Sequence, residues 1–593
     1  MTSVHKYNMG MIGNCSFLAY IDTRANVKWM CLPRFDSSFV FGSLLDEKRG
    51  GEFSITPTDS SFQTKQYYLD NTNILCTEFF NHDWSFRVID FAPRFRLYER
   101  NFRPLMFIRK IELLRGNPFI TVKCLPVYDY GNLVPEIVTG SNHIRFLNLG
   151  TQVRLTTDIP LNYVIHNTPF VLSENRYLVF TYGIPLEAPL VSTAEDFLDK
   201  TKKYWQLWVK STSIPHFYQR EIIRSALVLK LHQYEDTGGI IAAGTTSLPE
   251  YDQAGRNWDY RHCWLRDTYY TLNAFNHIGH FEELEKYFQF IQNIILSEQH
   301  RIQPVYSVTG QKKLTETILD LDGYMGNKPV RIGNEAYTHI QNDNYGQVLV
   351  SLLPLFVDER LNIAGQKSSL PLVHWLLQRI EETMEEPDAG IWEFRNTLQH
   401  HCYTFLFHWA GSKAAFRIGQ YANDQPLKRK ALKLIKESAN HIESCYDPQR
   451  KVYLQATAVP HLDASTLQLI AMNYLPGNSR KAILHLRALE KELKTNDGLF
   501  YRYRHEDDFG KPKSTFLVCA FWHVEALACI GHMKEAIQYF EQLLLFSNHL
   551  GLFSEDVDAS GNQWGNFPQT YSHVGLINAA FRIAKKLDTP LFH

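Results

Sequence analysis

The sequence has none of the features that would direct the protein to a membrane or to nucleic acid. No run of residues approaches the roughly 20 apolar positions of a membrane-spanning helix. The 61 Lys and Arg nearly balance the 62 Asp and Glu, and a net charge of −1 creates no global field for acidic partners. The opening stretch "MTSVHKYNMGMIGNCSF" lacks a basic region followed by an apolar run, so no secretory signal is expected there.

Cysteine is scarce and follows no pattern. The nine cysteines are scattered, none stands in a CxxC spacing, and their number is odd. A disulfide framework or a zinc site is therefore not expected, and a reducing compartment fits better. His262, His401 and His573 lack a second ligand at i+3 or i+4, so we interpret them as hydrogen-bonded structural residues. We expect a cytoplasmic protein without metal, cofactor, membrane or nucleic-acid partner.

Aromatic residues are abundant, at 13% of the sequence. The length of 593 residues exceeds what one hydrophobic core usually supports, so at least two domains are expected. Residues 1–192 contain short β-branched and aromatic runs, such as "SFRVIDFAP" and "FITVKCLPVY", separated by Gly, Pro, Asn and Asp. This pattern predicts an antiparallel β-sandwich. Residues 193–216 start with a helical period and are predicted to be a linker helix, and residues 217–593 are predicted to be all helical.

The helical region alternates long and short connections. About twelve helices are predicted, with starts near residues 217, 267, 281, 343, 369, 399, 424, 462, 479, 515, 532 and 568. Helices joined by short loops run antiparallel, so six such hairpins in a ring would collect all the long loops at one end. This organisation favours an (α/α)6 barrel with a polar, aromatic pocket at one mouth. An open α-solenoid is the alternative.

The six long loops combine aromatic residues with carboxylates and arginine, which suits a sugar site. They contain "NWDYRHCWLRD" (257–267), "VRIGNEAYTHIQND" (330–343), "PDAGIWEFRN" (387–396), "QATAVPHLDAS" (455–465), "GLFYRYRHEDDFGKPKS" (498–514) and "SEDVDASGNQWGNFPQTYSH" (554–573). Aromatic faces cover the C–H face of a pyranose, and planar charged groups bind its hydroxyl pairs.

Two glutamates in these loops are candidates for acid–base catalysis. Glu393 follows Trp392 in "GIWEFR", and an adjacent indole is expected to desolvate the carboxyl and raise its pKa, as suits a general acid. Glu555 in "LFSEDVD" is the candidate base, and glycoside hydrolysis needs such a pair. Structural roles compete with these assignments. A glutamate before a helix usually caps it, and Arg266 with Asp267 would equally suit an ion pair or helix cap.

The motifs "NWDYRHCWLRD", "GIWEFR", "HLDAS" and "GNFPQTYSHVGLINAA" resemble those of glycoside hydrolase family fifteen, the glucoamylase, glucodextranase and trehalase group. The stretch "IGNCSFLAYIDTRANVKWMCLPRFDS" resembles the start of that family's trehalase-like N-terminal domain. The resemblance covers nearly the full length. It implies a β-sandwich over residues 1–192, an (α/α)6 barrel over residues 217–593, and hydrolysis with inversion.

The resemblance also implies residue roles. By position, Glu393 matches the general acid, Glu555 the general base, and Tyr260 a tyrosine that supports the attacking water. In "SED", Asp556 stands where many bacterial members have a second Glu.

The remaining implied roles concern sugar binding. Arg266 and Asp267 match a pair that holds the hydroxyls of the released glucose. The other positions implied near the sugar ring are Trp258, Trp392, Tyr571 and, with a less certain alignment, Arg502.

The implied reaction releases β-glucose from the non-reducing end of a small α-glucoside. The N-terminal resemblance favours α,α-trehalose, and short α-glucans remain open. A glycoside phosphorylase of similar architecture is one alternative, and it would use phosphate in place of a base-activated water. A non-catalytic sugar-binding protein is another, which the intact Glu393 and Glu555 pair disfavours.

Overall fold

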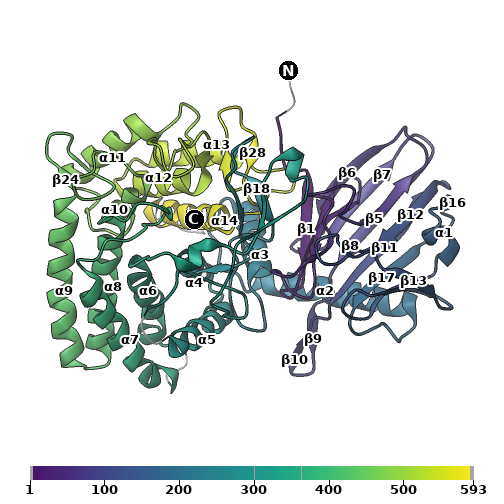
Figure 1. Cartoon of the computed structure of the whole chain (residues 1–593), viewed down its shortest axis with the longest axis horizontal. Helices are drawn as coiled ribbons and strands as arrows, with labels where there is room; N and C mark the ends of the chain where they lie inside the picture. The colour runs from purple at the N-terminus through teal and green to yellow at the C-terminus, as the bar shows by residue number, and fades with distance from the viewer. Residues whose placement is uncertain (1–3, 299–300, 362–363, 588–593) are drawn as a thin grey trace.

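The computed structural model describes residues 4–298, 301–361 and 364–587. Figure 1 shows two parts side by side, with antiparallel sheets in the first third of the chain and helices in the rest. Among the residues described, no helix is both long and apolar enough to cross a bilayer.

The first part consists of two facing layers of antiparallel strands. One layer is an eight-stranded sheet in the order β13 (Glu136–Thr139), β14 (His143–Leu147), β15 (Val153–Thr157), β17 (Arg176–Tyr182), β11 (Met106–Arg115), β8 (Ser85–Phe91), β7 (Leu75–Phe80) and β6 (Gln63–Tyr68). The other layer contains β1 (Met9–Gly13), β2 (Leu18–Asp22), β3 (Val27–Cys31) and β4 (Phe39–Phe41), followed by β16 (Phe170–Val171), β12 (Phe119–Leu125) and β5 (Glu52–Pro57). Aromatic pairs join the layers, with ring centroids 5.5 Å apart for Phe41 and Phe180 and 5.8 Å apart for Phe53 and Phe107.

A long helix, α2 (Leu190–Lys210), covers the outer face of the eight-stranded sheet. Its buried positions recur every three or four residues, so one stripe of the helix is apolar. Ala194 and Leu198 of this stripe pack against Ile89, Ile108 and Val179 of the sheet. The helix predicted from residue 193 is thus observed, three residues longer at its start, while the predicted domain limits stay a prediction.

The second part contains helices of two kinds. The inner helices are α4 (Leu265–Ile278), α6 (Asp343–Val357), α8 (Cys402–Tyr421), the 3-10 turn η3 (Ala464–Leu467) continuing into α10 (Gln468–Ala471), α12 (Leu517–Cys529) and α14 (Thr570–Leu587). The outer helices are α3 (Gln219–His232), α5 (Phe281–Ser297), α7 (Ala364–Thr383), α9 (Gln425–Ser444), α11 (Arg480–Leu493) and α13 (Met533–Leu544). The predicted helix starts mostly lie within a few residues of these.

The inner helices contact one another in sequence: α4 packs on α6, α6 on α8, α8 on η3, α10 on α12, and α12 on α14. The last of them, α14, packs against α4, which closes a ring of contacts. Each outer helix packs on an inner one. Inner helices are covered on all sides, whereas outer helices face solvent on one side, so the two kinds differ in burial. The inner α12 buries an unbroken run of residues, whereas the outer α9 buries a single stripe.

Short two-stranded sheets and one three-stranded sheet lie in the connections. They are β9 (Phe95–Leu97) with β10 (Arg100–Phe102), β18 (Thr246–Pro249) with β19 (Asn257–Asp259), β20 (Cys263–Trp264) with β21 (Val305–Tyr306), β22 (Thr317–Leu319) with β23 (Val330–Ile332), β24 (Tyr446–Asp447) with β25 (Val452–Tyr453), and β26 (Thr515–Phe516) with β27 (Asp556–Val557) and β28 (Gln563–Trp564).

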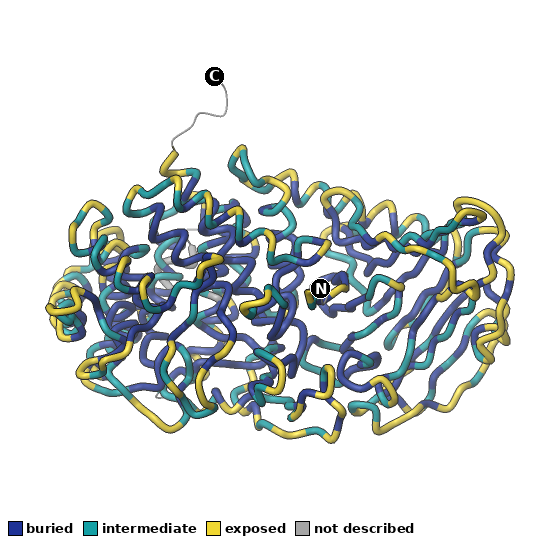
Figure 2. The backbone as a smooth tube through the Cα atoms, turned by 90° about the horizontal axis from the view of Figure 1, so that it is seen from above, coloured by how far each residue is buried: buried dark blue, intermediate teal, exposed yellow. Residues whose placement is uncertain are grey.

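Buried polar contacts join the two parts. The Trp29 indole of β3 donates to the Gly244 carbonyl at 2.9 Å. Arg261, which follows β19, donates to Asp259 at 2.8 and 2.9 Å and to the Ser37 carbonyl of the first part at 2.7 Å. Figure 2 shows buried backbone on both sides of this junction. Arg261 and Asp259 are each 1% exposed, so water cannot stabilise either charge and each needs the other as its counter-ion.

Replacing Arg261 by Leu is therefore expected to lower the free energy of unfolding by about 3–5 kcal/mol, because the Asp259 carboxylate would stay buried without its counter-ion. Urea denaturation measures the change. The double variant Arg261→Leu/Asp259→Asn is the control and should be less destabilised, because it leaves no uncompensated charge. Equal losses in the two variants would contradict this account.

Candidate active site

The long connections meet around a cavity whose empty volume is about 820 Å³ when its open mouth is included. Eight of the nine residues nominated from sequence line it: Trp258, Tyr260, Arg266, Asp267, Trp392, Glu393, Arg502 and Tyr571. The loop over residues 455–465, also predicted to contribute, provides no lining residue. Its Asp463 lies behind the wall, where it accepts from the Trp392 indole.

At the start of the "NWDYRHCWLRD" segment, the alternation of strand β19 directs neighbouring side chains to opposite sides. Successive side chains of a strand point to opposite faces. Trp258 and Tyr260 line the cavity. Asn257 and Asp259 point the other way, where Asp259 pairs with Arg261 and Asn257 donates to backbone carbonyls. One short stretch thus supplies both a cavity wall and the junction with the first part, which accounts for its unusual density of charge and aromatic rings.

Arg266 and Asp267 lie in the first turn of α4, at the inner end of the cavity. The helix begins at Leu265, two residues earlier than predicted, and its N-cap residue is Trp264, which makes no capping hydrogen bond with its side chain. Asp267 is 2% exposed, and its Oδ1 atom has no hydrogen-bond partner among the described residues, although Arg266 Nε lies 3.4 Å away. Burial raises the pKa of Asp267 to about 6, against the opposing charge of Arg266. Asp267 therefore does not occupy the N-cap position, and it lines the inner end of the cavity beside Arg266.

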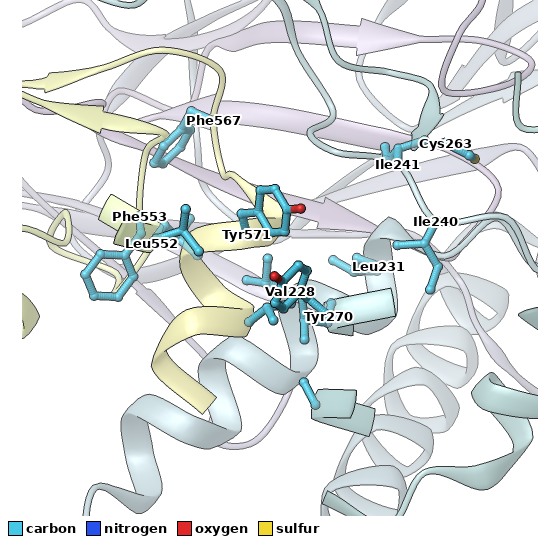
Figure 3. Packing of buried hydrophobic residues seen from close by; sticks show 14 of the residues in the cluster. Val228, Leu231, Ile240, Ile241, Cys263, Tyr270, Leu552, Phe553, Phe567 and Tyr571 are labelled. Atoms are coloured by element: carbon cyan, nitrogen blue, oxygen red, sulfur yellow. The ribbon is translucent and has the colours of Figure 1, made fainter. Parts of the chain in front are cut away.

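Tyr571, in the first turn of α14, completes the inner end. It is 2% exposed, and its ring lies 5.4 Å from that of Tyr270 on α4. Figure 3 shows both rings within the apolar packing that includes Val228 and Leu231 of α3. Close packing beneath a polar cavity fixes the positions of the groups that line it.

Glu393 is held by three donors on its Oε1 atom. Trp264 Nε1 lies at 2.7 Å, Arg266 Nη2 at 3.0 Å and Gln341 Nε2 at 3.3 Å. Its backbone adopts a φ of 63°, in the left-handed region that a non-glycine residue rarely occupies. Such strain persists where the surroundings impose it, and it occurs frequently at functional sites.

The prediction that Trp392 raises the pKa of Glu393 is wrong. The Trp392 indole instead donates to Asp463 Oδ2 at 2.8 Å. Burial acts to raise the pKa of the Glu393 carboxyl, but the charges of Arg266 and His339 and the donated hydrogen bonds hold it below its usual value. Without substrate, Glu393 is therefore an ionised carboxylate paired with Arg266.

Glu555 lies behind the wall and does not line the cavity. It is 1% exposed, its Oε1 accepts from the Tyr260 hydroxyl at 2.8 Å, and its Oε2 accepts from the Asn566 backbone N–H at 3.2 Å. The Tyr260 ring lies 5.4 Å from that of Trp264, whose indole binds Glu393. Tyr260 and Trp264 thus connect the two candidate carboxyl groups.

Glu250 is a cavity residue that sequence reasoning missed. It lies in the turn between β18 and β19, pairs with Arg502, and accepts from Trp258 Nε1 at 3.2 Å. Burial is the largest of the effects that raise the pKa of Glu555 well above its usual value, and the charges of Asp556 and Glu250 raise it further. The only signal in the sequence was an isolated Glu in the turn-forming "PEYDQAG", which is too common a pattern to indicate a site.

Among the residues that the structure describes, no group of three or more His, Cys, Asp and Glu could hold a metal ion. The cavity wall is instead rich in aromatic and arginine side chains, a composition suited to a sugar ring and its hydroxyls.

Known proteins share this organisation. Residues 216–581 match Glycosyl hydrolases family 15, and residues 3–157 match a trehalase-like N-terminal domain. A trehalase of Thermoplasma volcanium is 32% identical over 598 residues, which cover 98% of this chain and 93% of the relative. A trehalase of Mycobacterium tuberculosis is 31% identical over 610 residues, covering 95% and 87%.

A crystal structure of a bacterial glucoamylase with acarbose has a TM-score of 0.71 to this structure at 14% identity, and the match covers 99% of this chain and 95% of the other. At that identity the likeness shows a common fold. Together with the sequence matches, this common fold identifies the protein as a glycosidase. The chain belongs to glycosyl hydrolase family 15, as the sequence motifs indicated, and is a hydrolase of the trehalase and glucoamylase type.

Proposed function

We propose that this protein is an inverting exo-hydrolase that releases β-glucose from α,α-trehalose, with Glu393 as general acid and Glu555 as general base. The facing sheets form its β-sandwich, and the ring of helices forms an (α/α)6 barrel with the cavity at one mouth. The observation that carries the proposal is the link from Glu393, which lines the cavity, through Trp264 and Tyr260 to Glu555, which lies behind the cavity wall.

In this mechanism Glu393 protonates the glycosidic oxygen and Glu555 takes a proton from water on the other face of the sugar. Tyr260, already bonded to Glu555, orients that water. Inversion needs roughly 6.5–9.5 Å between the two carboxyl groups so that water fits. Arg266 and Asp267 hold the glucose hydroxyls. Protons and water perform all the chemistry, so no cofactor is needed.

Substrate must reverse the protonation states of the free enzyme. The pKa of Glu393 is held low partly by Arg266, and the pKa of Glu555 is raised by burial and neighbouring carboxyls. Sugar hydroxyls that bind Arg266 and Asp267 would draw the guanidinium away from Glu393 and raise its pKa. A water beside Tyr260 would hydrate Glu555 and lower its pKa. Binding would thus convert Glu393 to an acid and Glu555 to a base.

Replacing Asp556 by Asn is expected to move the limb of the kcat/KM pH profile that belongs to Glu555 to lower pH. The Asp556 charge raises the pKa of Glu555, so its removal lowers that pKa. A base works only when ionised, and a lower pKa therefore extends activity to more acidic solutions. Asp558→Asn on the same hairpin is the control and should leave that limb in place. A shift to higher pH in Asp556→Asn would contradict the assignment.

Trehalose is favoured by two findings. The N-terminal 3–157 match is to a trehalase-like domain, and the curated relatives from Thermoplasma and Mycobacterium are named trehalases. The likeness to the glucoamylase is one of fold. The expected partner is therefore a small α-glucoside.

A panel of trehalose, maltose, isomaltose and maltotriose, assayed for glucose release, tests the substrate. Proton NMR of the first product tests stereochemistry, because inversion gives β-glucose before mutarotation. Release of α-glucose would overturn the inverting mechanism. Phosphate-dependent turnover that yields glucose 1-phosphate would indicate a phosphorylase instead.

A further inference from the structure

Residues 5–8, here called the leading segment, lie just before β1 of the sandwich but contact the connection that carries Glu555. That connection forms a hairpin over residues 555–566, here called the base hairpin, whose two sides are β27 and β28. In Figure 1 the leading segment passes β28 before it enters β1. Tyr7 of this segment is 1% exposed and is not among the described residues that line the cavity. The sandwich part of the chain therefore reaches the catalytic part from behind the cavity wall.

We propose that the leading segment positions Glu555, and that His5 is the positioning residue that holds the base hairpin in place. This inference rests on the proposed function, because the segment takes part in the reaction only if Glu555 is the base. The base hairpin needs such support. Its paired strands β27 and β28 have 2 residues each, and a short two-stranded hairpin is marginally stable by itself.

His5 binds the base hairpin through both its backbone and its ring. Its backbone N–H donates to Asn562 Oδ1 at 2.6 Å, and its carbonyl accepts from the Gln563 N–H at 2.9 Å. Its ring Nδ1 donates to the Gln563 carbonyl at 2.9 Å, which leaves Nε2 to accept from the Tyr324 hydroxyl at 2.8 Å. The ring also stacks on Trp564, with centroids 4.9 Å apart. Burial lowers the pKa of His5, which favours the neutral ring that this arrangement requires.

Tyr7 adds a second attachment to the same hairpin. Its backbone N–H donates to Gln563 Oε1 at 3.0 Å. Its ring centroid lies 4.9 Å from that of Phe567, which follows the hairpin, and 5.5 Å from that of Tyr324. Gln563 is fully buried and also donates from Nε2 to the Leu552 carbonyl at 3.2 Å. One glutamine thus joins the leading segment to the chain on both sides of Glu555.

The residues that His5 holds lead directly to those that touch the Glu555 carboxyl. Gly565 follows β28 with a φ of 74°, and a Cβ built on it would lie 2.5 Å from Glu555 Oε2, so only glycine permits this approach. The Asn566 N–H donates to the same Oε2 at 3.2 Å, and the Asn566 carbonyl accepts from the Glu555 N–H at 3.2 Å. A displacement of β28 would therefore move the groups that fix the carboxyl.

His5→Ala is expected to lower kcat by about tenfold or more and to leave KM nearly unchanged, because misplacing a catalytic group slows the reaction without removing a sugar contact. The limb of the kcat/KM pH profile that belongs to Glu555 should move to lower pH. Burial is the largest effect that raises the pKa of Glu555, and a loosened hairpin would admit water and lower that pKa. Hydrogen–deuterium exchange of residues 555–566, followed by mass spectrometry, should become faster.

Lys6→Ala is the matched control. Lys6 belongs to the leading segment, but its Nζ donates to the Leu545 and Ser547 carbonyls at 2.9 and 2.8 Å, outside the base hairpin. Its kcat and its pH profile should equal those of the unmodified protein. His5→Gln retains a side-chain donor and should restore part of the kcat lost in His5→Ala. It also serves as the test if the alanine variant fails to fold.

The outcomes separate this inference from the proposed function. If folded His5 variants exchange faster in residues 555–566 but keep the original kcat and pH profile, the segment only stabilises the fold and the inference is overturned. Unchanged exchange in those variants, or an equal loss of kcat in Lys6→Ala, overturns it as well. Near-normal hydrolysis by a folded Glu555→Gln protein would instead refute the proposed role of Glu555, on which the inference rests.

Discussion

Glu555→Gln is expected to reduce hydrolysis by about 10²–10⁴-fold, the usual contribution of a positioned acid or base, while sugar still binds. The amide cannot remove a proton from water. It can keep the shape of the site, because its oxygen can accept from the Asn566 N–H while its NH₂ group donates to the Tyr260 hydroxyl oxygen. Steady-state kinetics and a binding titration with a glucose ligand measure the two effects separately.

The matched control is Glu525→Gln. Glu525 of α12 is also buried and burial raises its pKa to about 7, but it does not line the cavity. Its amide variant should keep near-normal turnover.

External azide is expected to restore part of the activity of Glu555→Ala by entering the vacated space. Near-normal hydrolysis by a folded Glu555→Gln protein would remove Glu555 from the mechanism.

Much of the helical part could be predicted because its signals are local. A helix of period 3.6 shows its buried stripe within its own sequence, as in α9, where buried positions follow that spacing. The alternation of long and short connections predicted which loops meet, and residues from distant loops do line one cavity. Boundaries were less certain, since α4 starts at Leu265 with a Trp N-cap that no capping rule anticipates.

The electrostatics of the site could not be predicted because they depend on partners remote in sequence. Trp392 adjoins Glu393 in the chain, yet the indole that binds the carboxylate belongs to Trp264. Arg266, which holds the pKa of Glu393 down, is likewise far along the chain. Residue types in a loop indicate which chemistry is available. Only packing decides which charges face each other, and hence the direction of each pKa shift.

Asp267→Asn is expected to lower kcat/KM by about 10²–10³-fold, comparable to the loss of one preorganised polar contact in a transition state. The substitution preserves size and removes the charge that accepts the glucose hydroxyls most strongly. The effect should depend on pH in a defined direction. Burial raises the pKa of Asp267 to about 6, so the charge is present above that pH and lost below it. The difference between the two proteins should therefore be largest above pH 6 and shrink as the pH falls.

A structural role for Asp267 predicts the opposite result. If its main contribution were to the start of α4, thermal stability would fall and kcat/KM would change little. Asp424→Ala is the reference for the loss of a helix cap, because Asp424 is the N-cap residue of α9 and accepts from the Leu427 N–H at 2.9 Å. That variant should lose about 1 kcal/mol of stability with unchanged kcat/KM. Since Asp267 is not the N-cap residue of α4 and its Oδ1 has no hydrogen-bond partner among the described residues, we expect its variant to show the reverse: intact folding and impaired catalysis.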